Sequence, residues 1–175
     1  MDWYLKVLKN YVGFRGRARR KEYWMFILVN IIFTFVLGLL DKMLGWQRAG
    51  GEGILTTIYG ILVFLPWWAV QFRRLHDTGR SGWWWGAGII ATYGFGTIFV
   101  IDLGISSLIN FPPAAISAFL GKFVLFAIAY IAYHIVMIVF LCQDSEPFEN
   151  RYGESPKYVV DPDSDGIDTP DAKID

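Results

Sequence analysis

The sequence predicts an all-α integral membrane protein whose helices form a four-helix bundle. Hydrophobic residues make up 54% of the 175 residues and charged residues only 18%, against about 25% charged residues in soluble domains. The apolar residues are gathered into four long runs, each near the roughly 20 helical residues that cross a bilayer core. These runs are continuous rather than alternating, which excludes the strands of a membrane barrel.

The first predicted element is an amphipathic helix over residues 2–12 that lies on the membrane surface. At about 100° per residue, its side chains separate into a basic polar face and an apolar face. The apolar face holds Trp3, Tyr4, Leu5, Val7, Leu8, Tyr11 and Val12. A soluble helix that packs against the loops is the alternative.

The four long apolar runs are the predicted membrane spans. Within a single membrane domain of residues 1–160, they cover residues 24–40, 54–72, 83–101 and 123–142. Pro66 predicts a kink in the second span, which membrane helices tolerate. In the third span Gly88, Thr92 and Gly96 recur every four residues. Small residues at this spacing let helices approach closely.

Residues 102–122 are predicted to form a loop with a short interfacial helix. This stretch is mildly apolar, and it is interrupted by Asp102, Asn110, Pro112 and Pro113. A re-entrant segment and a fifth span stay open as alternatives.

Residues 161–175 predict a disordered acidic tail, because they are rich in aspartate and poor in apolar residues. Asp161, Asp163 and Asp165 match the opening of a calcium loop. Ala172 stands where such a loop has a bidentate glutamate, so a solvated tail is the favoured interpretation.

The basic residues predict the orientation of the chain. Residues 1–22 carry seven Lys and Arg and residues 73–82 carry three, whereas residues 41–53 and 102–122 carry two and one. Basic loops stay in the cytoplasm, which predicts a bacterial inner-membrane protein with both termini cytoplasmic. The tryptophans agree, because all of the eight but Trp46 then lie in or near the cytoplasmic interface.

Three polar signatures converge on this predicted cytoplasmic face: residues 14–24 (FRGRARRKEYW), 73–85 (RRLHDTGRSGWWW) and 149–156 (ENRYGESP). The positions that matter are Phe14, Gly16, Arg17, Ala18, Arg20, Glu22, Tyr23, Trp24, Arg73, Arg74, Leu75, His76, Asp77, Asn150, Arg151, Tyr152 and Gly153. In combination they resemble the YhaH-like family of small bacterial inner-membrane proteins, a domain family of unknown function. The resemblance is close over residues 1–84, and the second half departs from it. It implies a location in the inner membrane and brings no reaction with it.

The segment 73–82, predicted as an interfacial loop, holds the densest cluster of polar side chains. Arginines at an interface can neutralise lipid phosphates at about 1 kcal/mol each. His76 beside Asp77 suggests a proton-transfer pair, but Asp77 can equally cap the following turn or pair with an arginine. We favour a lattice of carboxylates and arginines that ties the three signatures together. The candidate polar or anionic-headgroup site comprises Arg17, Arg20, Glu22, Arg73, Arg74, His76, Asp77, Arg80 and Arg151.

Inside the membrane, His134 is the ionisable residue nearest mid-span, with Tyr130 one turn before it. An intramembrane ionisable residue suggests function, and a neutral histidine bonded to a neighbouring helix is the more ordinary explanation.

The predicted function is a non-enzymatic membrane module whose basic, tryptophan-rich face binds anionic lipid or a protein partner, possible homo-oligomers included. One rival is a small transporter or channel-like oligomer that uses His134. The other is a lipid-headgroup enzyme that uses His76 and Asp77. The sequence contains no phosphate-binding glycine loop, HExxH, GxSxG or CxxC motif. We therefore expect no catalytic residue, metal, cofactor or nucleic-acid partner.

Overall fold

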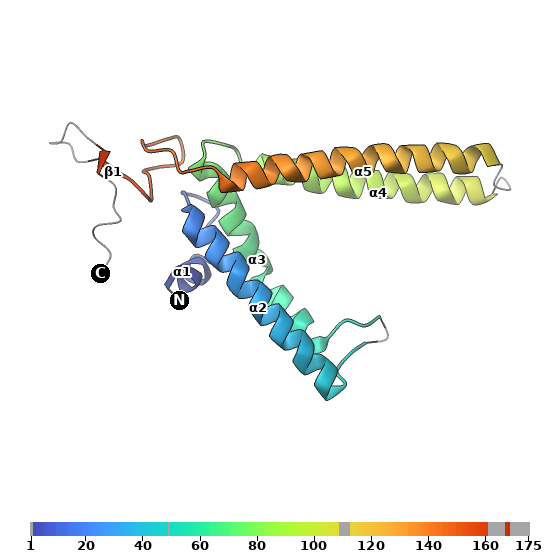
Figure 1. The fold of residues 1–175 in the computed structure, drawn as a ribbon, viewed down its shortest axis with the longest axis horizontal. Helices are drawn as coiled ribbons and strands as arrows, with labels where there is room; N and C mark the ends of the chain where they lie inside the picture. The colour runs from blue at the N-terminus through green and yellow to red at the C-terminus, as the bar shows by residue number, and fades with distance from the viewer. Residues whose placement is uncertain (1, 49, 109–112, 161–166, 169–175) are drawn as a thin grey trace. The chain divides into compact units, whose positions relative to one another are not determined.

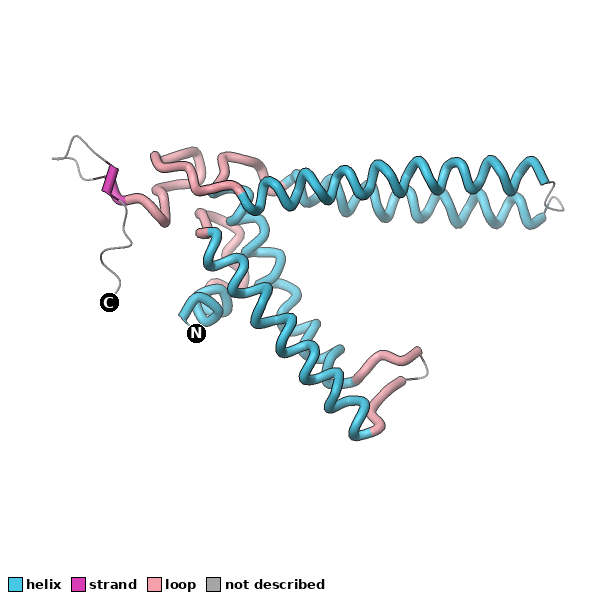
Figure 2. The backbone as a smooth tube through the Cα atoms, viewed as in Figure 1, coloured by secondary structure: helices cyan, strands magenta, loops and turns pink. Residues whose placement is uncertain are grey.

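A computed structural model describes residues 2–48, 50–108, 113–160 and 167–168. Its helices are α1 (Asp2–Lys9), α2 (Arg20–Leu44), α3 (Ile54–Asp77), α4 (Trp83–Leu108) and α5 (Pro113–Cys142) (Figure 1). Two short strands, β1 (Val159–Val160) and β2 (Ile167–Asp168), pair antiparallel near the end of the chain. The described chain is otherwise helix and loop (Figure 2).

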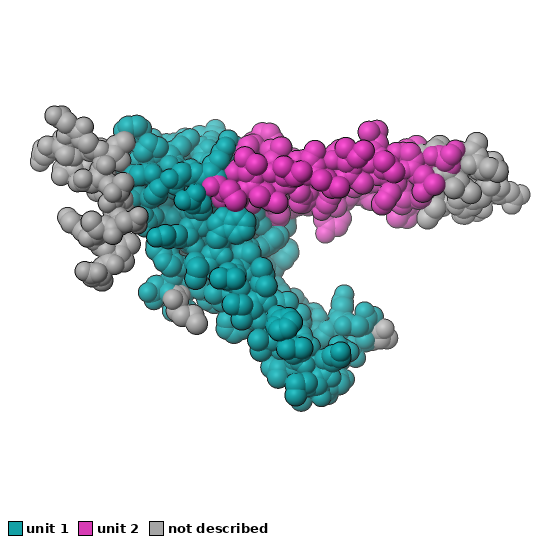
Figure 3. Space-filling view, in the orientation of Figure 1, with its two compact units in different colours: residues 1–82, 143–175 teal, residues 83–142 magenta. Residues whose placement is uncertain are grey.

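Four helices, α2 to α5, are long and apolar enough to cross a membrane, as predicted. The chain divides into two compact units (Figure 3). Unit 1 contains residues 1–82 and 143–175, and unit 2 contains residues 83–142. Each unit is built around one antiparallel pair of these helices.

Helix α3 continues to Asp77, so the prediction of a loop that starts at residue 73 is wrong for its first five residues. Basic side chains suit the last turn of a helix, where unpaired carbonyls carry partial negative charge. Arg74 and His76 occupy that turn. The chain turns at Gly79, whose φ of 70° is a left-handed conformation that favours glycine. The second signature therefore lies on a helix end, which fixes the direction of each side chain.

The stretch 102–122 also differs from the predicted loop, because its described residues are helical. Helix α4 runs on to Leu108 and α5 begins at Pro113, a residue that the first turn of a helix tolerates. The Lys122 ammonium lies 2.9 Å from the Asp102 carboxylate, so the two polar residues pair between the helices.

In unit 1, Asp41 connects the far ends of α2 and α3. Its carboxylate accepts hydrogen bonds from the backbone N–H groups of Leu55 (2.9 Å) and Thr56 (3.0 Å), which α3 itself leaves unpaired. A Cβ on Gly53 would lie 1.9 Å from the Asp41 carboxylate, so only glycine fits this approach. Asp41 therefore caps α3 from another helix.

Helix α1 covers Asp2–Lys9 of the predicted segment 2–12 and packs against α2 and α3. The Tyr4 ring stacks on Phe26 at 5.3 Å between centroids, and Val7 is fully buried. The Tyr4 hydroxyl lies 3.1 Å from that of Tyr59 on α3. The location of α1 at the membrane surface stays a prediction.

Tyr11 repairs a defect that Pro66 makes in α3. In an α-helix the carbonyl of residue 62 accepts a hydrogen bond from the N–H of residue 66, and proline has no N–H. The Tyr11 hydroxyl donates to the Leu62 carbonyl instead. This bond compensates for a proline within an apolar helix, where an unpaired carbonyl is costly.

Unit 2 is an antiparallel hairpin of α4 and α5 that packs through aromatic rings. Phe95 and Phe126 stack face to face with 3.6 Å between their centroids. The Tyr133 hydroxyl donates to the Trp84 carbonyl at 2.6 Å. A Cβ on Gly88 would lie 2.3 Å from that hydroxyl, so Gly88 provides the close approach expected of a small residue.

Within α5, the Nδ1 atom of His134 lies 2.9 Å from the carbonyl of Tyr130 on its own helix, and the two rings are 4.1 Å apart. A carbonyl can only accept, so this contact places the proton on Nδ1 of a histidine bonded locally.

After α5, residues 143–158 belong to unit 1 and lead to β1. The predicted acidic tail, residues 161–175, lies outside the described residues apart from β2.

Candidate functional site

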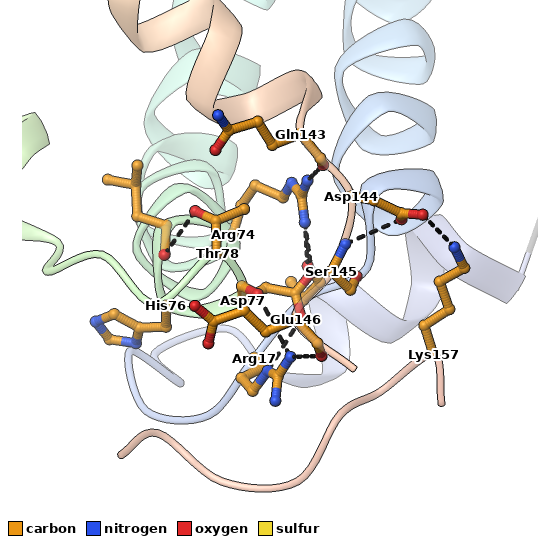
Figure 4. Close-up of polar contacts among 12 residues, drawn as sticks. Arg17, Arg74, His76, Asp77, Thr78, Gln143, Asp144, Ser145, Glu146 and Lys157 are labelled. Atoms are coloured by element: carbon orange, nitrogen blue, oxygen red, sulfur yellow. Dashed lines mark hydrogen bonds and ion pairs between the residues drawn. The ribbon is translucent and has the colours of Figure 1, made fainter. Parts of the chain in front are cut away.

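The three signatures meet in unit 1 around the carboxylate of Asp77, which is completely buried. The Arg17 Nε atom donates to its Oδ1 at 3.1 Å. The Arg74 guanidinium and the Ser145 hydroxyl both donate to its Oδ2. Figure 4 shows these donors arranged around Asp77. We call Arg17, Arg74, Asp77 and Ser145 the ionic cluster.

Arg17 holds the chain that follows α5. Its side chain is 1% exposed. Its Nη1 donates to the carbonyls of Phe148 (2.8 Å) and Gly153 (3.1 Å), and its Nη2 donates to that of Glu146. One guanidinium from the first signature thus binds both the second signature and the third.

Arg74 makes a second set of links from the same cluster. It is fully buried, and it donates to the carbonyls of Ala18 (3.4 Å) and Gln143. The Gln143 side chain in turn accepts a hydrogen bond from Arg80. The five N–H donors of a guanidinium suit it to this bridging of several acceptors.

A second buried ion pair lies between α2 and α3. The Glu22 carboxylate accepts from Nη1 of Arg73 at 3.1 Å, and the Lys6 ammonium on α1 lies 3.1 Å from its other oxygen. Glu22 is 0% exposed and Arg73 4%. Within the described part of the chain, Nε and Nη2 of Arg73 have no hydrogen-bond acceptor. These two donors remain for a water molecule or an anion.

His76 points away from the Asp77 carboxylate and stacks on Tyr152, with 3.7 Å between ring centroids and 5° between ring planes. Its Nδ1 lies 3.2 Å from the carbonyl of Gly16. The Arg151 guanidinium lies 4.7 Å from the other ring of this stack, Tyr152. The adjacent His76 and Asp77 are therefore joined to different partners, and no hydrogen bond between their side chains is found among the described residues.

At Gly79 the chain must approach Glu146 closely. A Cβ on Gly79 would lie 2.2 Å from the Glu146 carboxylate, which accepts from the Asn150 side chain at 2.7 Å. The same Asn150 amide donates to the His76 carbonyl at 3.0 Å. The segment after α5 is thus fitted against the end of α3 by backbone contacts as well as by charge.

Asp144 and Lys157 form a partly exposed pair at the rim of the site, and Figure 4 shows their contact. The hydrogen bond from the Lys157 ammonium lowers the pKa of Asp144 below its usual value. Burial acts to lower the pKa of Lys157, but its hydrogen bonds with Asp144 and Tyr158 raise that pKa overall. Each partner stabilises the charged form of the other.

This geometry suits the ionic cluster for holding the fold together rather than for proton transfer. A buried ion pair that loses one partner destabilises a protein by about 3–5 kcal/mol, because the remaining charge is uncompensated. Asp77 accepts from two guanidinium groups and a hydroxyl, so both oxygens of this buried carboxylate have partners. Both carboxylates, Asp77 and Glu22, are paired with two cations each. Lys6 is about half exposed, but three buried guanidinium groups, those of Arg17, Arg73 and Arg74, face these two carboxylates, so the buried charge is in excess on the positive side.

The structure brings together most, but not all, of the predicted site residues. Arg17, Arg73, Arg74, Glu22 and Asp77 are buried in the two ion-pair groups. By contrast, the exposed or half-buried members lie around them: Arg20, Arg80 and Arg151. The favoured prediction is a lattice of carboxylates and arginines that joins the three signatures, and the pair of Asp77 with Arg17 is part of such a lattice. The predicted site did not include Lys6, Gln143, Ser145 or Glu146, although Gln143 to Glu146 directly follow a span and lie beside a polar signature. Tyr152 was named only as a position of the third signature.

Comparison with known proteins places this geometry in a family. A family model described as a protein of unknown function (DUF805) matches residues 11–154. The chain is 62% identical to the inner membrane protein YhaH of Escherichia coli K12, over 90% of this chain and 98% of that relative. It is 37% identical to the inner membrane protein YhaI of the same strain, again over 90% and 98%. The similarity thus extends well beyond residues 1–84. No solved structure matches the chain.

Proposed function

The chain belongs to the DUF805 family, and from that premise we propose that it is a multi-pass inner-membrane protein whose cytoplasmic face binds anionic phospholipid headgroups. In this proposal the buried arginines have a structural role, and a separate set of exposed cations contacts the lipid. Both termini and the ionic cluster lie on the cytoplasmic side, in accord with the excess of Lys and Arg there.

The observation that carries the proposal is the division of charge between buried and exposed side chains. Over residues 2–24 the carboxylate of Glu22 is buried, and the exposed charged residues are one acid, Asp2, and five cations: Lys6, Lys9, Arg15, Arg20 and Lys21. A Lys or Arg near an anionic membrane surface contributes about 1 kcal/mol to binding. Such a cluster beside an apolar helix end is the electrostatic pattern that favours anionic lipid.

An aromatic residue supports the position of these exposed cations at the headgroup region of the membrane. Trp24 is 38% exposed at the start of α2, directly after the basic residues. Tryptophan prefers the headgroup region, because its ring is apolar and its N–H can reach water or a headgroup. The cations therefore sit at the level where lipid phosphates lie.

The test measures lipid retention by the purified full-length protein in a neutral detergent. The protein is mixed with equal amounts of phosphatidylglycerol and phosphatidylcholine, and retained lipid is counted by native mass spectrometry. The test variant replaces Lys9, Arg15 and Lys21 with glutamine. We expect it to retain phosphatidylglycerol roughly a hundredfold less well than the parent chain, since three contacts of about 1 kcal/mol each are removed.

The matched control replaces Lys42 and Arg48 with glutamine, two exposed cations at the other end of the α2–α3 hairpin. We expect it to retain phosphatidylglycerol as the parent chain does. Equal retention of both lipids by the parent chain would contradict the proposal. So would an equal loss of phosphatidylglycerol in the test and control variants. Unchanged lipid retention in the test variant would also contradict it, and would mean that the face binds protein alone.

A further inference from the structure

Helix α5 has two faces of different composition, and the face toward α4 is aromatic. Its aromatic residues recur every seven positions: Phe119, Phe126, Tyr133 and Phe140. The three phenylalanine rings lie 4.1, 3.6 and 5.3 Å from rings of α4, and the Tyr133 hydroxyl bonds the backbone of α4. Figure 1 shows the two helices side by side. A straight α-helix drifts about 20° per heptad from a seven-residue repeat, so these contacts indicate that α5 winds left-handedly around α4.

The opposite face of α5 carries a row of β-branched side chains. They are separated alternately by four and three residues, which is the spacing of the a and d positions of a heptad repeat. We call them the β-branched stripe: Val124, Ile128, Ile131, Ile135 and Ile138. Each is between 53% and 61% exposed. All four isoleucines of residues 119–142 belong to the stripe, so they are gathered on the side that α4 leaves uncovered.

The heptad spacing continues over the whole membrane-crossing part of α5. Gly121 lies three residues before the stripe and Cys142 four residues after it, which extends the repeat to three heptads. These 21 residue steps rise about 32 Å, close to the roughly 30 Å of a hydrocarbon core. Sustained repeats of about three to four heptads are typical of coiled coils. The stripe is therefore long enough to form a seam through the bilayer.

Contact with lipid alone does not require such a stripe. Lipid chains are as apolar as the side chains, so helices associate in a membrane through close packing rather than through hydrophobicity. β-Branched side chains have one strongly preferred χ1 rotamer in a helix, and they therefore lose little freedom when another helix packs against them. The winding of α5 around α4 also keeps the seven-residue repeat on one side. These properties favour a second helix over lipid as the neighbour of the stripe.

His134 supports a protein neighbour at the edge of the stripe, since it directly precedes Ile135. Its Nδ1 donates to the carbonyl of Tyr130, so its Nε2 is left as an acceptor. Among the residues that the structure describes, no donor reaches Nε2. Ionisable residues within membrane spans almost always face protein or a water-filled cavity. This side of α5 is thus unsuited to lipid alone.

We propose that the β-branched stripe binds the same stripe of further copies of this chain, so that their α5 helices form a parallel coiled coil. Copies inserted in the same direction present identical residues at the same depth, and each a or d position meets its equivalent. Isoleucine at both positions favours three or four strands over two. The contact concerns unit 2 alone and is independent of the lipid binding proposed for residues 2–24.

Cys142 allows a direct test, because it is exposed, has the spacing of the stripe and is the single cysteine of the chain. The full-length protein is reconstituted in liposomes at a low protein-to-lipid ratio and treated with a short bismaleimide, which joins two thiols. We expect crosslinked pairs of chains as the main product. Light scattering of the uncrosslinked protein in a mild detergent should give the mass of three or four chains.

Two neighbouring positions test the stripe itself. In a Cys142→Ser background, Ile135→Cys places a thiol on the stripe, whereas Val136→Cys places one on an exposed residue outside it. A disulfide needs Cα atoms within about 7 Å of each other. Oxidation with iodine, which enters the membrane, should therefore join the Ile135→Cys chains several-fold more completely than the Val136→Cys chains.

A pair of alanine variants tests the packing. Ile131→Ala combined with Ile135→Ala removes bulk from the middle of the stripe and is expected to reduce crosslinking at Cys142 roughly tenfold. The matched control is Ile98→Ala combined with Ile101→Ala, which makes the same change at two exposed residues of α4. We expect the control to crosslink as the parent chain does.

Three results would overturn the proposal. One is the mass of a single chain without crosslinking at Cys142, which would mean that no second copy covers the stripe. Another is equal disulfide formation by Ile135→Cys and Val136→Cys. The third is crosslinking that the alanine changes at residues 131 and 135 leave intact, which would place the contact between copies elsewhere.

Discussion

Unit 1 and unit 2 are both antiparallel pairs of apolar helices, but different interactions hold them together. In unit 1 the ends of α2 and α3 are joined by buried ion pairs, a carboxylate cap and a tyrosine that replaces a missing backbone donor. In unit 2 the helices pack through stacked rings, and the ion pair between Asp102 and Lys122 is exposed. Specific polar contacts therefore determine one unit and general apolar packing the other.

The difference matters because polar contacts within a membrane protein have few alternatives. An apolar side chain in a lipid-facing helix can exchange one neighbour for another at little cost, since lipid chains are as apolar as the protein. A buried guanidinium that loses its carboxylate has no such substitute. We infer that unit 1 tolerates substitution of its polar residues poorly, and that unit 2 tolerates it well.

The largest expected effect comes from Asp77→Asn. This change keeps the size of the side chain but leaves Arg17 and Arg74 buried without their carboxylate. We expect the free energy of unfolding to fall by about 3–5 kcal/mol, as for other broken buried ion pairs. Thermal unfolding in detergent, followed by circular dichroism, measures the change.

The matched change in unit 2 is Asp102→Asn, which breaks the exposed pair with Lys122. We expect it to cost less than about 1 kcal/mol. Equal losses of stability in the two variants would remove the distinction between the units.

A smaller effect is expected from Tyr11→Phe, which removes the hydroxyl that donates to the Leu62 carbonyl. We expect a loss of about 1 kcal/mol, the usual size for one hydrogen bond. In a Pro66→Ala background residue 66 regains its N–H and can bond that carbonyl, so the same change should cost close to nothing. A double-mutant cycle on unfolding midpoints measures this coupling.

Tyr133→Phe is the counterpart in unit 2, since the Tyr133 hydroxyl donates to the Trp84 carbonyl. That carbonyl is followed four residues later by Gly88, which has an N–H, so helix geometry already supplies a donor. We expect a smaller loss than for Tyr11→Phe. If Tyr11→Phe lowers the free energy of unfolding by the same amount in the Pro66→Ala background, the Tyr11 hydroxyl does not act by replacing the missing N–H of residue 66.

The smallest effect is a pH dependence from the rim pair of Asp144 and Lys157. Because folding lowers the pKa of Asp144, the pair's contribution is complete above the unfolded value of about 3.8 and is lost as the pH falls through the folded pKa. Since both side chains are partly exposed, we expect less than about 1 kcal/mol. The unfolding midpoint of Asp144→Asn should therefore approach that of the parent chain between pH 5 and about 3. A gap between them that stays constant over this range would argue against the assignment.

Much of the fold could be predicted from hydropathy, because a membrane span needs a long apolar run and the chain has four. The errors share one cause. Polar residues at 73–77 and 102–122 were interpreted as breaks in a helix, whereas those that the structure describes are helical, and several have partners within the protein. A polar residue ends a span only if its side chain has no hydrogen-bond or ion-pair partner in the folded protein. A sequence pattern does not show which residues have such partners.

The candidate site was predictable in part for the same reason. Carboxylates and arginines in three signatures on one predicted face suggested ion pairs, and Arg17 with Asp77 is such a pair. The other acceptors of Arg17 are the backbone carbonyls of Glu146, Phe148 and Gly153. Every residue has a carbonyl, so no residue type marks those positions. The burial that separates Arg17 from Arg15 likewise depends on the tertiary fold.

Arg15 and Arg17 test the central claim most directly, because they are two residues apart in one signature, and one is exposed while the other is buried. The measurement compares Arg15→Gln with Arg17→Gln for the thermal unfolding midpoint and for the retention of phosphatidylglycerol. We predict that Arg17→Gln unfolds at a much lower temperature, as for other broken buried ion pairs. Arg15→Gln should keep the midpoint in phosphatidylcholine and retain less phosphatidylglycerol. An Arg17→Gln variant as stable as the parent chain, or an Arg15→Gln variant that loses stability instead of lipid, would contradict the account.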